Sequence, residues 1–93
     1  MPTGPWPTTR TSGQLALWAA HSLEIPTARG ARIACERAAE AGLVTWGHIL
    51  VEEVADAIEA GAVASGGELR AELVQVAAVV CAWLEDLDRE AGR

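Results

Sequence analysis

Apolar residues recur every three or four positions along most of the chain, which is the spacing of residues that share one face of an α-helix. The clearest case lies near the C-terminus, where apolar residues alternate intervals of four and three: Leu69, Leu73, Val76, Val80, Trp83 and Leu87. This heptad spacing predicts a long helix over about 68–90 that packs against another helix along this line. No run of four to eight residues alternates apolar and polar side chains, so no strand is expected.

Residues that begin or end helices divide the preceding sequence into three shorter elements. These helices are predicted at residues 14–23, 28–41 and 46–60. Thr27 and Thr45 can accept hydrogen bonds from the first turns of the second and third helices. Gly42 and Gly61 are expected to end those helices, because glycine adopts the left-handed conformation common at helix ends. The first helix should stop before Pro26, because the residue preceding a proline avoids the helical conformation.

A chain of 93 residues makes one domain at most. Residues 1–12 are rich in Thr and Pro and are predicted to be a mobile, disordered tail. Residues 13–93 are predicted to form a single all-α domain, a short bundle of three main helices with a short N-terminal helix. The apolar face of the last helix, widened by Val79 and Ala82, exceeds what one partner helix would cover. We therefore expect a homodimer or a higher homo-oligomer to complete the bundle.

Composition limits the classes of partner. The chain has 7 Arg, no Lys and 13 acidic residues, for a net charge of −6, which argues against binding to nucleic acid. Its longest nearly apolar run, 73–84, is shorter than the ~20 residues of a membrane span. The N-terminus lacks the basic and apolar regions of a secretory signal. Cys35 and Cys81 are too few and too far apart for a disulfide framework or a zinc site. These features predict a cytoplasmic protein.

Most charged positions are predicted to face solvent. On the second helix Arg32, Glu36 and Glu40 recur every four residues, which is typical of an exposed stripe of ion pairs. On the third helix three polar residues project to the side opposite the apolar face: His48, Glu52 and Glu59. Trp46 and Trp83 are interpreted as packing residues.

Glu53 interrupts the apolar face of the third helix. In projection it lies between Trp46 and Ala60, and Asp56 follows three positions later at the edge of the same face. On the last helix Glu72 projects between two apolar residues in the same way, and Gln75 follows three positions later. Each helix thus carries two oxygen-bearing side chains on neighbouring positions beside its apolar face.

If these two helices are antiparallel neighbours, four oxygen-bearing side chains converge: Glu53, Asp56, Glu72 and Gln75. Three carboxylates in a half-buried cleft repel one another, so either their pKa values rise or a cation holds them. Oxygen ligands without Cys or His favour Mg²⁺ or Mn²⁺. The same positions also suit acids at the edge of a core whose carboxylates simply reach water.

The two segments TWGHILVEEVADAIEA and ELRAELVQVAAVVCAWLEDLDRE, with the helix before them, resemble the MazG-like nucleoside triphosphate pyrophosphohydrolases of the small actinobacterial and phage type. That family carries E-E-x-x-E and, after a spacer, E-x-x-D on two helices of an all-α bundle. Here the first part reads Glu52-Glu53-Val54-Ala55-Asp56 and the second reads Glu72-Leu73-Val74-Gln75. The likeness covers roughly residues 28–90.

The resemblance implies hydrolysis of a nucleoside triphosphate to a monophosphate and pyrophosphate, with Mg²⁺ as cofactor. Carried over by position, Glu53, Asp56 and Glu72 would be metal ligands, with Gln75 as a fourth. Glu52 would either support the metal ligands as a neighbouring acid or orient the attacking water, and with Glu53 it would make up the catalytic pair.

Two positions depart from the family pattern and leave other functions open. Asp56 stands in place of Glu, and Gln75 in place of Asp, which removes one negative charge from the site. No lysine is present to meet a triphosphate, and Arg70 projects away from Glu72. The alternative is therefore a weak or inactive helical dimer that binds a nucleotide or a protein. A small acidic regulatory protein is a third possibility.

Overall fold

The computed structural model describes residues 20–63 and 66–92 of the chain. Three helices make up most of it: α2, Ala28–Glu40; α3, Trp46–Ala62; and α4, Gly66–Ala91. The end of a further helix precedes them at residues 20–22. No residue in these two ranges lies in a strand, so the predicted all-helical architecture is confirmed. The predicted tail, 1–12, and the predicted start of the first helix lie outside the described residues.

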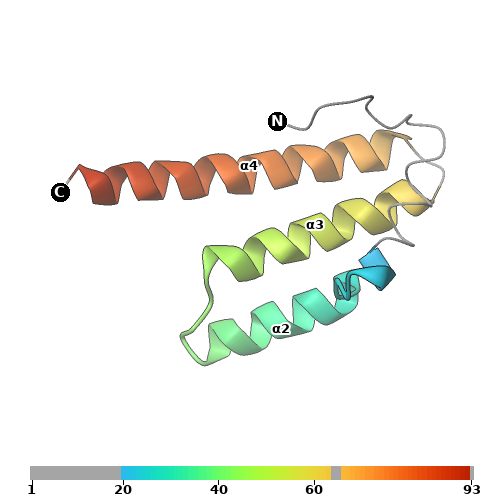
Figure 1. Ribbon diagram of the computed structural model, residues 1–93, viewed down its shortest axis with the longest axis horizontal. Coiled ribbons are helices and arrows are strands. Elements are labelled where there is room, and N and C mark those ends of the chain that lie inside the picture. The colour runs from blue at the N-terminus through green and yellow to red at the C-terminus, as the bar shows by residue number, and fades with distance from the viewer. Residues whose placement is uncertain (1–19, 64–65, 93) are drawn as a thin grey trace.

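The three helices lie side by side and alternate in direction (Figure 1). α3 is the middle helix and packs against α2 on one side and α4 on the other, while α2 and α4 do not meet. The five residues at 41–45 connect α2 to α3, and a connection this short makes consecutive helices antiparallel neighbours. Because the helices form one layer, α4 has one face packed toward α3 and a second face on which no other described helix packs.

The predicted starts of α2 and α3 are confirmed, whereas α4 begins at Gly66, two residues earlier than predicted. The hydroxyl of Thr27 accepts a hydrogen bond from the backbone N–H of Gly30 at 3.0 Å and so caps α2. At α3 the cap is reciprocal: Thr45 accepts from the N–H of His48 at 3.3 Å, and Nδ1 of His48 accepts from the N–H of Thr45 at 3.1 Å. The His48 ring is thereby engaged in starting a helix.

One of the two predicted glycine helix ends is correct. Gly42 has φ +72°, and the N–H of Leu43 donates to the carbonyl of Ala38 at 2.8 Å, which is the pattern of a left-handed helix end. The prediction that Gly61 ends α3 is wrong, because the helix continues through it and Val63 is the first extended residue. A single glycine lowers helix propensity without preventing helix, so its presence did not fix this boundary.

The helix before α2 ends before Pro26, as predicted, but without a glycine. Glu24 adopts φ 60°, and the N–H of Ile25 donates to the carbonyl of Ala20 at 2.8 Å. This is the same left-handed helix end as at Gly42, built on a residue with a Cβ, for which that conformation is unfavourable.

The buried core of the described residues consists of small side chains: Ala20, Ala28, Ala31, Cys35, Ala55 and Ala57. Ala28, Ala31, Cys35 and Ala55 lie where α2 meets α3, and none of the buried residues lies on α4. Small side chains let two helix backbones approach closely, and Ala28, Ala31 and Ala55 form one buried cluster between α2 and α3.

The predicted heptad line on α4 is divided between two faces. The half-buried residues of α4, which we name the inner row, are Leu69, Glu72, Val76, Val79, Ala82, Trp83 and Asp86. Leu73 and Leu87, at 51% and 50%, are among the exposed ones. The prediction that the whole heptad line packs against a neighbouring helix is therefore wrong for half of the line, namely Leu73, Val80 and Leu87. The reason is that α3 packs against the inner row. No helix in the described part of the chain is long and apolar enough to cross a membrane.

Candidate metal centre

Three carboxylates meet where α3 faces the first half of α4. Glu53, Asp56 and Glu72 each offer one oxygen atom, and these atoms all lie within 4.8 Å of one another. All three residues are half-buried. Glu53 and Asp56 are neighbours because they are three residues apart on a helix, and Glu72 is the third member of the group, from the opposing helix.

The antiparallel packing of α3 and α4 is what brings these acids together. At the other end of the contact, the indole N–H of Trp46 at the start of α3 donates to Asp86 near the end of α4 at 3.0 Å. This bond links residues 40 positions apart and fixes the register of the two helices. Trp46 therefore packs between helices, as predicted, and also holds a hydrogen bond that projection on one helix does not show.

The electrostatics of the cluster are unfavourable without a cation. Burial raises the pKa of Glu53 above its usual value, and the neighbouring Asp56 and Glu72 raise it further. Burial also raises the pKa of Asp56, although the guanidinium of Arg32 opposes the shift. Both acids thus hold their negative charge less readily than they would in water.

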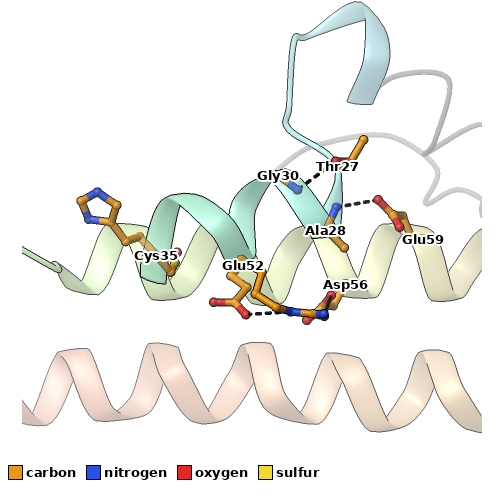
Figure 2. Close-up of polar contacts among 9 residues, drawn as sticks. Thr27, Ala28, Gly30, Cys35, Glu52, Asp56 and Glu59 are labelled. Carbon is orange, nitrogen blue, oxygen red and sulfur yellow. Dashed lines mark hydrogen bonds and ion pairs between the residues drawn. The ribbon is translucent and has the colours of Figure 1, made fainter. Parts of the chain in front are cut away.

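Arg32 of α2 supplies the positive charge nearest to these acids. Its Nε lies 3.7 Å from Glu52, and its Nη2 lies 3.8 Å from Asp56 (Figure 2). Arg32, Glu36 and Glu40 are all exposed, as predicted, but the ion pairs of Arg32 are with acids on α3 and not with Glu36 or Glu40. Although the Arg32 side chain is half exposed, it pairs with acids on α3, because Glu52 and Asp56 lie one turn apart on the flank of α3 beside α2.

Gln75 and Arg70 do not join the group. Both are exposed, and in the described part of the chain neither makes a hydrogen bond or an ion pair with Glu53, Asp56 or Glu72. One helical turn separates Gln75 from Glu72, but its side chain lies outside the half-buried inner row. The observed group thus contains three of the four predicted ligands.

The donor set suits a hard divalent cation. Carboxylate oxygens are the preferred ligands of Mg²⁺ and Mn²⁺, and a divalent ion would offset both the burial and the mutual repulsion of the three acids. Three protein oxygens also leave coordination positions for water or phosphate. By donor chemistry and spacing, the residues present fit such an ion.

Two neighbouring residues have roles that the sequence pattern did not indicate. Glu59, assigned to a solvent-facing side, accepts a hydrogen bond from the backbone N–H of Ala28 at 2.6 Å and so caps α2 from α3 (Figure 2). The thiol of Cys35 donates to the carbonyl of His48 at 3.0 Å. Burial and the nearby Glu52 carboxylate raise the pKa of Cys35 to about 11, so this thiol stays protonated and is not a nucleophile.

Comparison with protein families, with curated proteins and with solved structures found no match to this chain. The resemblance to MazG-like enzymes therefore rests on the residues quoted above.

Proposed function

We propose that this chain is a Mg²⁺-dependent nucleoside triphosphate pyrophosphohydrolase of the MazG-like type, with Mn²⁺ as a possible substitute ion. The observation that carries the proposal is the convergence of Glu53, Asp56 and Glu72, which lie at the motif positions of that family. Three half-buried carboxylates this close together are costly to desolvate and repel one another, and a bound divalent cation would offset both effects.

Each residue of the group has a role in the proposed reaction. Glu53, Asp56 and Glu72 would hold the cation, and Glu52 would orient the water whose oxygen attacks the α-phosphorus. The bond from that phosphorus to the oxygen bridging to the β-phosphorus breaks, and pyrophosphate leaves. A bound Mg²⁺ would polarise the phosphate and lower the pKa of the attacking water.

Arg32 supports the proposal in a way that composition did not suggest. A triphosphate needs positive charge beside the metal, and the chain has no lysine. The guanidinium of Arg32 is half exposed and lies within 4 Å of Glu52 and Asp56. It can therefore turn from these acids to a phosphate oxygen, where arginine binds well.

The proposal includes a homodimer in the cytoplasm. The layer of three helices leaves large apolar side chains of α4 exposed, which favours association. Cys35 and Cys81 are both free thiols, as expected in a reducing compartment.

Pyrophosphate release from a panel of nucleoside and deoxynucleoside triphosphates, with Mg²⁺ or Mn²⁺, tests the enzyme. Wild type should turn over at least one substrate, and Glu53→Gln should lower the rate by at least about a hundredfold, because it removes a ligand charge without changing shape. Glu85→Gln, an exposed acid on α4 away from the group, is the matched control and should keep the wild-type rate. No turnover above that of Glu53→Gln would overturn the proposal.

The alternative is a binding module that has lost catalysis. Gln75 favours it, because a neutral and exposed amide stands where the family pattern has Asp, so the site has one negative charge fewer. Calorimetry with a triphosphate analogue whose α–β bridge resists hydrolysis separates the two functions. Mg²⁺-dependent binding together with no pyrophosphate release would support the binding module.

A further inference from the structure

The outer face of α4 carries a continuous apolar surface that no helix in residues 20–63 covers. Five residues at intervals of four and three, which we name the outer row, are all exposed: Leu73, Ala77, Val80, Leu84 and Leu87. Val74 and Cys81 flank this row and are exposed as well. Leu84 leaves 54% of its surface in contact with solvent, although it lies in the middle of the longest helix. A heptad row of this kind fits the matching row of another helix.

The charges at the two ends of the outer row point to its occupant. Arg70 precedes the row and Asp88 follows it, and both are exposed. They are 18 residues apart, which is about five helical turns, so both lie on the same side of α4, roughly 27 Å apart along its axis. Neither forms an ion pair within the described part of the chain. The face is thus apolar along its length, positive at one end and negative at the other.

We propose that α4 pairs in antiparallel fashion with α4 of a second copy of this chain, row against row. Two-fold symmetry then places Arg70 of each copy opposite Asp88 of the other, so that one contact forms two ion pairs. The same register sets Leu73 of one copy beside Leu84 of the other. This inference gives the surface of the homodimer proposed above and does not depend on the metal chemistry.

The charge pattern selects the antiparallel arrangement. In a parallel pair, two arginines would lie at one end of the contact and two aspartates at the other, and like charges at the same level are unfavourable. Ala77, near the centre of the row, is small enough to let the two helices approach closely. The inner row and its carboxylates stay packed against α3 in either case.

Exchange of the two end charges tests this register. Analytical ultracentrifugation of the full chain should give a dimer that Arg70→Asp weakens by roughly tenfold, since both symmetric ion pairs become repulsive. Adding Asp88→Arg to the same chain should restore the affinity to within about threefold. Arg29→Asp, the same charge change on α2, is the matched control and should leave the dimer unchanged. A double variant as weak as Arg70→Asp would overturn the register.

A second pair of variants tests the surface itself. Leu84→Glu should give a folded monomer at concentrations where wild type is a dimer, whereas Leu43→Glu, in the loop before α3, should stay dimeric. Cys81 reports the arrangement, because the two thiols would lie on the same side and about 6 Å apart along the helix axes. A short bis-maleimide should therefore join two wild-type chains but not two Cys81→Ser chains, while Cys35 is buried.

The results separate this inference from the proposals before it. A dimer that survives Leu84→Glu would overturn the α4 surface and keep the homodimer. A wild-type monomer would overturn both, and a monomer whose Cys81 resists maleimide would show that another segment of the chain covers this face. Pyrophosphate release is measured independently of all three outcomes.

Discussion

The contact between α2 and α3 and the contact between α3 and α4 use opposite means. The first is built from small, buried side chains, such as Ala31 and Ala55, and is closed by the Glu59 bond to the start of α2. The second is built from larger residues that are only half-buried, with acids among them. Close approach of two helices needs small side chains, whereas a site for a ligand needs space and polar groups between them.

This difference separates a structural part from a functional one. α2 and the flank of α3 beside it are joined by small buried side chains and by capping residues that each have a partner. α4 is a long helix that, among the described residues, packs only against α3, and it places Glu72 beside the two acids of α3. The two properties that remain to be tested, the metal site and self-association, both involve α4.

The largest expected effect comes from enlarging a residue in the tight contact. Ala55→Leu adds volume where 2% of the alanine surface is exposed, and overpacking of this kind costs about 1–3 kcal/mol. Chemical denaturation should show that loss of unfolding free energy. Ala78→Leu, on the exposed side of α4, is the matched control and should change it little. Equal effects at both positions would contradict the difference in packing.

A smaller loss of unfolding free energy is expected from removing the hydrogen bond by which Glu59 of α3 caps the start of α2. Glu59→Ala removes the carboxylate that accepts from Ala28 at 2.6 Å, and a charge-assisted bond at a helix N-terminus contributes about 1–2 kcal/mol. Glu40→Ala, at the exposed C-terminal end of α2, serves as the control. Amide hydrogen exchange should be faster in the first turn of α2 in the Glu59 variant only; uniform exchange along α2 would be inconsistent with a local cap.

Substitutions at the two left-handed helix ends are expected to change the free energy of unfolding by a similar or smaller amount. Gly42→Ala places a Cβ at φ +72° and should destabilise the chain by about 1 kcal/mol. Glu24→Gly removes a Cβ at φ 60° and should stabilise it by up to about 1 kcal/mol, less the entropy that glycine adds to the unfolded chain. Thermal melts of the two variants should shift in opposite directions. A fall in melting temperature for Glu24→Gly would contradict this expectation and would mean that the Glu24 side chain stabilises the folded state.

The smallest expected effect concerns pH. Because the folded pKa of Glu53 lies above its usual value of 4.5, the folded state binds the proton more tightly, and stability from this group falls as pH rises through that window. Without metal, Glu53→Gln should therefore melt at a higher temperature than wild type at pH 7, with a smaller difference at pH 4. Adding Mg²⁺ at pH 7 should raise the melting temperature of wild type and not of the variant. An unchanged difference between the two pH values would contradict the raised pKa.

Local sequence patterns predicted most of the helices and much of the candidate site. Thr27, Thr45 and Gly42 act within a few residues of themselves, so their roles follow from the chain alone. The positions of Glu53 and Glu72 within apolar faces are also local, because helical periodicity fixes them. Gly61 misled because glycine permits a helix end without requiring one.

The tertiary structure decided what each residue meets. Which face of α4 meets α3 depends on how the two helices pack against each other. This packing places Glu72 beside Glu53 and Asp56 and leaves Leu73 and Leu84 exposed. Arg32 and Glu59 were assigned to solvent from their own helices, yet their partners lie on a neighbouring one. The sequence by itself determined helices and their apolar and acidic faces, because these depend on neighbours three or four residues away. Only packing between distant segments determined which faces meet.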